Sequence, residues 1–355
     1  IQRHRRGMTR RADRKRNIQP DTWNLCTSRT HRAAFRFSEL DATDRLYIWG
    51  YLIVAAQMYG VDVAIVFFAS NHIHLICKAQ IPEAISLFHC HFKAQVARFI
   101  QRKHGLTGAV WAGRFHNQNL LDDEAQVQAL TYILDHGMRD LLVERSDAWH
   151  LPQTIKELCG DGILRGRAWR RTVGRRKGEW RQVKARLVPL DPWSDDRAGF
   201  RAFVKQRLED RVAHYAALRA AQQAAHDNAV AAAVDAGQDP ATVTVPTGRL
   251  RSILRQHDYV PPQAKRSRAT RFKARGPEAD ALLEAALEAH KAACAKYEAC
   301  LVDFDASTPP DLPQGFQWPT ALAARLEVPV IARTWAEVFA ASEPVPKGAG
   351  WAQAG

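Results

Sequence analysis

Residues 61–76 read VDVAIVFFASNHIHLI, and the interpretation of the whole chain starts from this stretch. Its first eight residues are apolar, β-branched or aromatic apart from one acid, which is typical of a buried strand. We expect that strand to continue into residues 71–76. Because residues i and i+2 of a strand point to the same side, His72 and His74 would present two imidazoles to one point in space.

Alternating helix and strand patterns surround this stretch. Apolar residues at helical spacing predict helices over residues 43–59 and 83–103, and Gly60 and Gly105 stand just past their ends. A strand pair, or a strand and a loop, is expected over 22–37, a strand over 110–121, and a helix from the acidic run at 122–124 to about residue 136. This order predicts an α+β fold, with helices packed on a largely antiparallel sheet.

Changes in composition divide the chain into five parts. We expect a basic N-terminal arm at residues 1–18, a compact α+β domain at 19–150 and a basic linker or DNA-contacting arm at 151–190. An Ala-rich, mainly helical C-terminal domain then covers 191–306, and a Pro-rich tail covers 307–355.

The charge balance points to a polyanionic partner. The chain has 51 Lys and Arg against 37 Asp and Glu, a formal net charge of +14 and a pI near 9.8. Such an excess repels itself in a compact chain unless a polyanion is bound, so nucleic acid is the first partner to consider. Alternatively, the excess positive charge lies in basic tails that are surrounded by solvent and bind no particular partner.

The location of the protein is inferred from its cysteines and its hydropathy. Six cysteines without a C-x-x-C pair, spread through 355 residues, indicate reduced thiols. No apolar run approaches the roughly 20 residues that span a bilayer, and no apolar signal segment follows the Arg-rich start. We expect a cytoplasmic protein, a monomer or homodimer, with no membrane partner.

A site for a divalent metal ion is the interpretation that joins the histidines to a possible nucleophile. Two imidazoles leave a divalent ion several open positions, as a Lewis acid on a phosphate oxygen requires. His136 is the best candidate for a third ligand, since it follows Tyr132 by four residues on a predicted helix and both side chains would share one face. A phenol beside the ion could attack a phosphodiester and form a tyrosyl phosphodiester. That covalent bond keeps the energy of the broken strand, so the strand can be rejoined without ATP.

Simpler interpretations exist for each of these residues. Tyr132 fits a core aromatic on an amphipathic helix, and His72 and His74 fit a pair of hydrogen-bonded, half-buried histidines. The sequence also contains His89-Cys90-His91, but its surroundings are helical, so those two histidines would point in different directions.

An ordered set of motifs resembles the HUH-type tyrosine transposases, and among them the REP-associated group. The set covers about residues 21–149 and consists of Asn-His-Ile-His-Leu at 71–75, Trp-Ala-Gly-Arg-Phe at 111–115, Leu-Leu-Asp-Asp-Glu at 120–124, Thr-Tyr-Ile at 131–133, and Arg139. The resemblance implies a ferredoxin-like fold, Mg²⁺ or Mn²⁺ bound by His72 and His74, and Tyr132 forming a 5′-phosphotyrosine on single-stranded DNA beside a hairpin. Where many members have Asn-Pro, this chain has His136-Gly137, and histidine can bind a metal where asparagine does.

Basic residues outside this set are the expected contacts to DNA. Arg114 lies beside aromatic residues on a predicted strand and would hold a phosphate or form an ion pair. Arginines interleaved with Trp169 and Trp180 suit neutralisation of the DNA backbone with base stacking, and the candidates are Arg165, Arg167, Arg170 and Arg171.

Three functions therefore remain open at this point. The first is a metal-dependent transposase that nicks and rejoins single-stranded DNA. The second is a domesticated relative that binds a DNA hairpin without cutting it. The third is a replication-initiator or relaxase-type nickase with the same site chemistry. For a member of this family we expect a bacterial protein located at the nucleoid.

Overall fold

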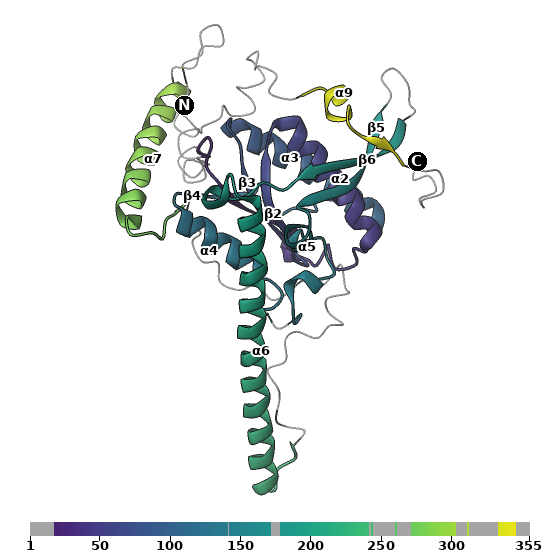
Figure 1. The fold of residues 1–355 in the computed structure, drawn as a ribbon, viewed down its shortest axis with the longest axis vertical. Coiled ribbons are helices and arrows are strands. Elements are labelled where there is room, and N and C mark those ends of the chain that lie inside the picture. The colour runs from purple at the N-terminus through teal and green to yellow at the C-terminus, as the bar shows by residue number, and fades with distance from the viewer. Residues whose placement is uncertain are drawn as a thin grey trace, which may run out of the picture.

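A computed structural model describes residues 18–140, 142–171, 178–240, 271–302 and 333–345, together with the single positions 243, 260 and 311. Its centre is a five-stranded sheet with the order β2-β3-β1-β4-β7 (Figure 1). Four of these strands pair antiparallel, and β4 pairs parallel with β7. The expected α+β class is confirmed. The predicted arm at 1–18 lies outside the described residues except for Ile18, and the described part of the tail at 307–355 is residue 311 and residues 333–345.

The elements of the first half follow the predicted order of strands and helices except at residues 61–76, where two strands replace the one expected. They are β1 Asn24–Arg29, α2 Ala42–Tyr59, β2 Asp62–Phe68, β3 His72–Lys78, α3 Pro82–His104, β4 His116–Leu120 and α4 Asp123–Leu134. Asp41 caps α2 through a reciprocal pair of hydrogen bonds with Asp44. Gly60 and Gly105 end α2 and α3 in the left-handed conformation, which glycine adopts without a Cβ clash.

The expectation of one strand running through residues 61–76 is wrong. The segment forms an antiparallel hairpin, in which Phe68 of β2 lies opposite Ile73 of β3. Ser70 and Asn71 lie in the turn between the strands, and both residue types favour turns because their side chains can bond to nearby backbone. His72 and His74 therefore stand at the beginning of a strand rather than at the end of one.

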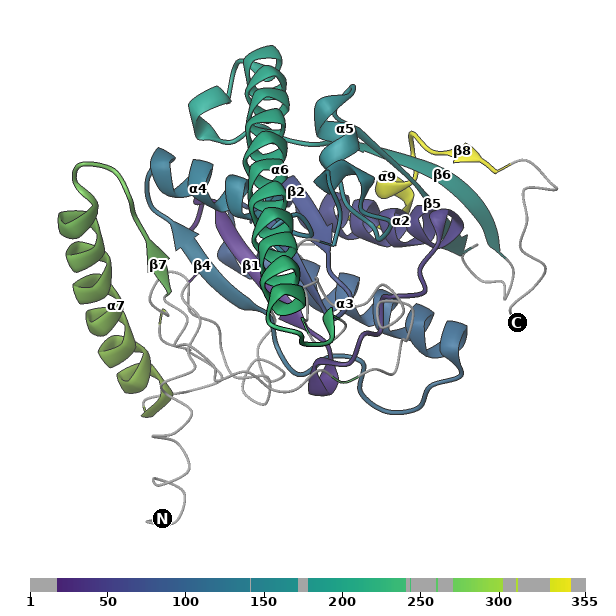
Figure 2. The same cartoon turned by 90° about the horizontal axis from the view of Figure 1, so that it is seen from below.

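The two faces of the sheet are covered by different helices. On one face α2 and α3 pack over the sheet, where Phe68 contacts Trp49 of α2 and Phe92 of α3. Phe67, the next residue along β2, points to the other face and stacks on Trp149. That second face is the one that α4 covers (Figure 2).

A long helix, α6 Arg197–Asp235, begins against α4 and α5 Ile155–Cys159 and projects far beyond the rest of the molecule (Figure 1). The first half of α6 is anchored by a buried stripe of Phe200, Val204, Leu208 and Tyr215. Arg211 also donates to both carboxylate oxygens of Asp135, at 2.7 and 2.9 Å. Its second half buries only Ala233.

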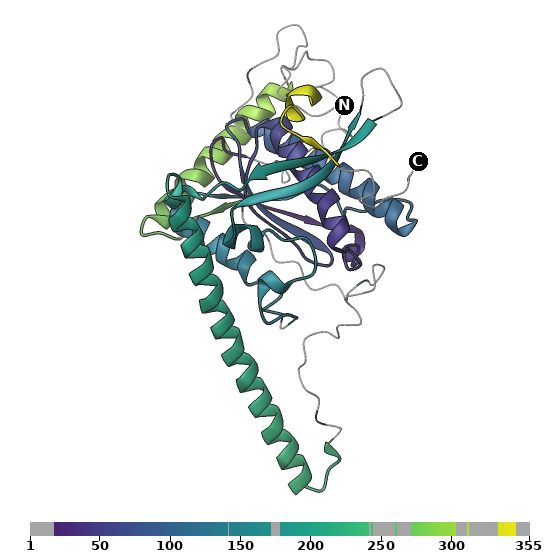
Figure 3. The same ribbon diagram turned by 45° about the vertical axis from the view of Figure 1, so that its right-hand side comes forward.

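Part of the predicted basic linker or arm forms two antiparallel paired strands, β5 Ile163–Arg171 and β6 Gly178–Arg186, called the β5–β6 hairpin below. The hairpin crosses α2 (Figure 3) at a point where Gly166 meets Gly50. A Cβ on Gly166 would stand 2.3 Å from the backbone nitrogen of Gly50, so only glycine permits this approach. β8 Glu343–Pro344 pairs with β6, next to α9 Trp335–Val338.

The remaining described elements are short 3-10 turns at His31–Ala33, Ser146–Ala148 and Asp191–Trp193, the edge strand β7 Phe272–Lys273, and α7 Ala279–Val302. Among the described helices, none combines the length and apolar character that a membrane crossing requires. All six cysteines are free thiols.

Candidate functional site

The site lies on the face of the sheet that α4 covers, and β3 provides its first two side chains. His72 and His74 lie on the same side of β3, with ring centroids 4.8 Å apart and ring planes at 86°. The period of two in a strand explains this arrangement. Both imidazoles therefore face the same space between the sheet and the end of α4.

His136 enters the same space from the other side. α4 ends at Leu134, two residues earlier than the pattern predicted, but the chain continues in a turn in which the N–H of His136 donates to the carbonyl of Ile133. The Nε2 atom of His136 is 3.0 Å from Nε2 of His72. One nitrogen from each of His72, His74 and His136 lies within 4.8 Å of the others.

Neighbouring polar groups orient two of these imidazoles. Nδ1 of His72 is 2.7 Å from Oδ1 of Asn71, which only accepts, so Nδ1 carries the proton and Nε2 keeps a lone pair for the centre of the cluster. Nδ1 of His74 is 3.1 Å from Oγ1 of Thr27 on β1. Partners of this kind fix the ring orientation of metal-binding histidines.

Burial keeps the three imidazoles neutral. It lowers the pKa of His72 to about 3 and that of His136 to about 2, helped in both by the positive charge of Arg139 and, for His72, of Arg29. Burial also lowers the pKa of His74 well below its usual value. The neutral imidazole is the form that binds a metal ion.

Tyr132 completes the arrangement from the last turns of α4. Its ring centroid is 5.3 Å from that of His74 and 5.4 Å from that of His136, and its side chain is half-buried. The guanidinium carbon of Arg139 lies 4.8 Å from the centroid of the same ring. Arg139 also donates to Nδ1 of His136 at 3.1 Å. A phenol, three neutral imidazoles and one exposed cation thus share one side of the sheet.

The arginines predicted to bind DNA are not part of this cluster. Arg114 is exposed in a bend before β4, not on a strand as the sequence suggested, because β4 begins only at His116. Arg165, Arg167, Arg170 and Arg171 lie on the hairpin that packs against α2, whereas Tyr132 lies on α4. Two of them form exposed ion pairs, Arg165 with Asp161 at 2.6 Å and Arg170 with Glu179 at 3.8 Å.

Sequence reasoning missed the contributions of Thr27, Asn71 and Arg29. Asn71 could have been found, since it directly precedes the histidines in the quoted stretch. Thr27 and Arg29 could not, because they reach the site only through the pairing of β1 with β3, which sets Thr27 opposite His74 and Arg29 opposite His72. Arg139 belonged to the recognised motif set, but its place over Tyr132 had no local signal.

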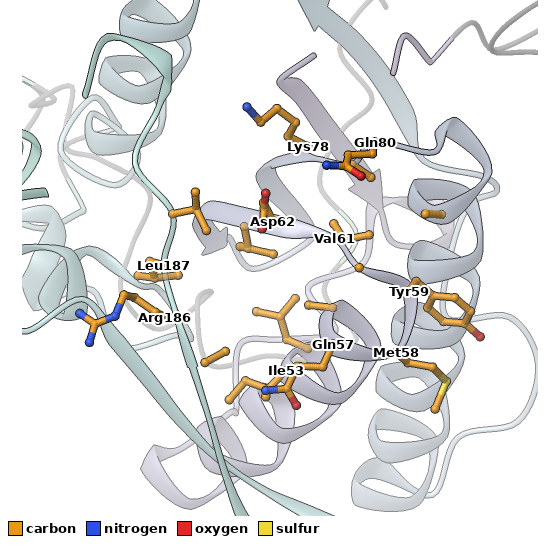
Figure 4. A pocket seen from close by; sticks show the side chains of 18 of the residues that line it. Ile53, Gln57, Met58, Tyr59, Val61, Asp62, Lys78, Gln80, Arg186 and Leu187 are labelled. Atoms are coloured by element: carbon orange, nitrogen blue, oxygen red, sulfur yellow. The ribbon is translucent and has the colours of Figure 1, made fainter. Parts of the chain in front are cut away.

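A cavity of about 750 Å³ lies elsewhere, between the end of α2, β2 and the segment after β6 (Figure 4). Ile53, Gln57, Asp62, Lys78 and Arg186 are among the residues that line it, and burial raises the pKa of Asp62. None of the three clustered histidines lines this cavity. It is therefore separate from the site described above.

The chain matches no protein-family model. No curated protein matches it either. A search of solved structures finds a REP-associated tyrosine transposase bound to a REP hairpin, with 15% identity and a TM-score of 0.32 over 40% of this chain and 80% of that one. It also finds a bacterial tRNA(His) guanylyltransferase (Thg1)-like protein in complex with GTP, with 10% identity and a TM-score of 0.30 over 57% and 99%. The same protein in complex with ATP has 10% identity and a TM-score of 0.29 over 57% and 97%. Because the TM-scores and the identities are this low, these similarities carry no argument about function.

Proposed function

We propose that this protein is a transposase-type enzyme that nicks and rejoins single-stranded DNA through a 5′-phosphotyrosine on Tyr132. One observation carries the proposal, namely that Tyr132 lies beside a cluster of His72, His74 and His136 with ring separations of 5.3 and 5.4 Å. The ordered motifs at residues 71–139 support the same assignment. We assign the catalytic part to residues 19–150 and interpret its β-α-β-β-α-β order as a ferredoxin-like arrangement.

The residues present fit a divalent ion. Nε2 of His74 is buried and makes no hydrogen bond to any described residue, and it faces the nitrogens of the other two histidines. An orphaned buried nitrogen is costly unless something binds it. His72, His74 and His136 would hold Mg²⁺ or Mn²⁺, with the remaining positions free for phosphate oxygens and water.

The ion, when bound, supplies Lewis-acid polarisation of the phosphate that is attacked. The other roles belong to the chain. Tyr132 Oη attacks phosphorus as its proton passes to water, the bond from phosphorus to the 3′ oxygen breaks, and that oxygen takes up a proton. The positive charge of Arg139 lies beside the phenol of Tyr132. It would stabilise the negative charge that develops on the phenolic oxygen and the phosphate during the attack. Rejoining runs the same steps backwards, without ATP.

The arginines outside the histidine cluster are assigned to binding of DNA rather than to its cleavage. Arg114, and on the β5–β6 hairpin Arg165, Arg167, Arg170 and Arg171, would neutralise the DNA backbone away from the cut. Trp169 is 43% exposed beside them and offers a surface on which a base can stack. A DNA hairpin is long enough to contact both the site and another part of the protein.

Trapping the covalent intermediate tests this proposal. Labelled single strands that carry hairpins are incubated with the protein and Mn²⁺, and denaturing gels are examined for a labelled protein band. The band is expected with the parent chain and with Tyr51→Phe, a tyrosine on α2 that faces α3. It should disappear with Tyr132→Phe and with a chelator.

The outcomes separate the alternatives. An adduct that survives Tyr132→Phe would discard the assignment of the nucleophile. Tight binding of DNA hairpins without any adduct would favour a binding protein that does not cut.

A further inference from the structure

A second cluster of metal-ligating side chains lies on the opposite face of the sheet, beneath α3. Cys26 comes from β1, Cys77 from β3 and His89 from α3, and all three are buried. One ligand atom from each lies within 4.8 Å of the others. None of these residues takes part in the function proposed above.

The spacing of the two thiols suits a shared metal ion. The Sγ atoms of Cys26 and Cys77 are 3.9 Å apart. Two thiolates at about 2.3 Å from a tetrahedral zinc ion stand about 3.8 Å from each other, whereas the sulfurs of a disulfide are about 2.05 Å apart. An ion could therefore bind between these sulfurs with almost no movement of the strands.

We propose that Cys26, Cys77 and His89 form a structural site for a thiophilic cation of the zinc class. Thiolates are soft ligands, which prefer zinc to magnesium or manganese, and of the two clusters only this one contains cysteines among its candidate ligands. The donor set thus distinguishes this site from the three histidines across the sheet.

The surroundings favour a structural role over a catalytic one. The ring of His89 stacks on Phe115 at 3.9 Å and lies edge-on to Phe88. Asn117, directly opposite Cys26 in the pairing of β1 with β4, is buried on the same face. All three candidate ligands are buried, and burial of the ligands is typical of structural zinc sites.

Charge balance favours a divalent ion at this position. Cys26 and Cys77 are both buried, with their Sγ atoms 3.9 Å apart, so two uncompensated thiolates at this position would be costly. Binding one divalent cation releases two protons and forms two thiolates, which leaves the buried group uncharged overall. Such a site avoids the cost of an isolated buried charge.

The site would tie together the strands that carry the candidate active site. Cys26 is adjacent to Thr27, the partner of His74, and Cys77 lies on the same strand as His72 and His74. An ion bound to Cys26, Cys77 and His89 would link β1 and β3 to α3. It would thereby fix the pairing of the two strands from the face opposite the candidate active site. The inference does not depend on whether Tyr132 acts on DNA.

Zinc analysis of the full chain, purified under reducing conditions, tests the inference. The measurement uses a variant with His72→Ala and His74→Ala, so that the other cluster cannot bind the ion. We expect one zinc per chain, with a zinc-edge X-ray absorption spectrum that shows two sulfur neighbours at about 2.3 Å. Cys77→Ala should lose the zinc, whereas Cys90→Ala, an exposed cysteine next to His89, should keep it.

Three results would overturn the inference: a chain without zinc, a zinc ion with only nitrogen and oxygen neighbours, or a disulfide between Cys26 and Cys77 found by peptide mapping. If Cys77→Ala does not fold, the site can still be tested by titrating Cys90→Ala with Co²⁺ and recording its absorption spectrum. The inference then requires thiolate-to-cobalt charge-transfer absorption, and its absence counts against the site.

Discussion

Each imidazole of the candidate site depends on a neighbour that sets its orientation. Thr27 contacts Nδ1 of His74, Asn71 contacts Nδ1 of His72, and Arg139 donates to Nδ1 of His136. A neutral imidazole that receives a hydrogen bond at Nδ1 carries its proton on Nε2. His136 must therefore lose the bond from Arg139 before its Nε2 can bind an ion as a neutral ring. The predicted binding of a metal and the position of Arg139 are thus coupled.

Replacing Thr27 by valine tests how much the orientation of His74 matters. Valine keeps the shape of threonine but removes the Oγ1 that lies 3.1 Å from His74. Loss of such a partner typically weakens metal binding about 10- to 100-fold. Mn²⁺ binding measured by calorimetry should show this loss, while Thr22→Val, at the start of the same segment, should bind like the parent. Equal affinities for both variants would mean that Thr27 does not position a ligand.

Replacing Arg139 by glutamine tests the role of the cation beside Tyr132. Removing one group that stabilises developing charge typically slows a reaction about 10²- to 10³-fold. The rate of adduct formation at saturating DNA should fall by this amount in Arg139→Gln and recover in part in Arg139→Lys. Arg98→Gln, an exposed arginine on α3, is the matched control. If Arg139→Gln changed only the DNA concentration needed, Arg139 would be a binding residue and not part of the reaction.

The helix α4 carries Tyr132, and Asp122, the residue just before the helix, holds the start of α4 in place. The carboxylate of Asp122 accepts from the N–H of Ala125 at 2.7 Å and thereby caps the helix. It also accepts from the N–H groups of Arg275 and Gly276, at 2.7 and 3.0 Å, which join α4 to the segment after β7. Although partial burial acts to raise the pKa of Asp122, these backbone donors hold it below its usual value.

Asp122→Ala should therefore destabilise the protein by about 1–2 kcal/mol, the usual cost of losing an N-cap. Because the pKa of Asp122 is lower in the folded chain, its contribution is present above about pH 4 and is lost as the pH falls below that value. Urea denaturation at pH 7 and at pH 3 measures both effects. Asp123→Ala, the exposed next residue, should differ little from the parent at either pH. A difference between parent and Asp122→Ala that stayed constant with pH would contradict the assigned role.

At the scale of the whole molecule, the site and the basic hairpin occupy different parts of the surface. Tyr132 lies on α4, which covers one face of the sheet, whereas the hairpin packs on α2, which covers the other. A ligand that contacts both has to be long and polyanionic, as a folded DNA strand is. The formal net charge of +14 is consistent with such a ligand.

Arg165→Gln combined with Arg170→Gln tests the contribution of the hairpin. Each lost contact to a single-stranded phosphate lowers the slope of log affinity against log salt by about 0.7. The double variant should thus show a slope smaller by about 1.4 and weaker binding at low salt, with an unchanged adduct rate at saturating DNA. Arg197→Gln with Lys205→Gln, two exposed positions on α6, is a control with the same change of charge. An equal loss in both variants would indicate diffuse attraction rather than contacts at the hairpin.

Sequence patterns were enough to predict the helices around the site and the three histidines that the structure brings together. The helices over α2 and α3 follow from apolar spacing and from Gly60 and Gly105, and these effects act within a few residues. The shared direction of His72 and His74 follows from the period of a strand, and the order of the motifs from 71 to 139 singled out Tyr132 and His136. All of these signals can be read from the sequence without knowing which distant segments meet in the fold.

Only the tertiary structure decided the contacts between distant segments. The turn at residues 69–71 converts one apolar run into two paired strands, and the pairing of β1 with β3 brings Thr27 to His74 and Cys26 to Cys77. The close approach of Gly50 and Gly166 turned an expected linker into a hairpin on α2. The pairing of β1 with β3 and the packing of the β5–β6 hairpin on α2 depend on segments that are far apart in the sequence, and no local pattern encodes which segments meet.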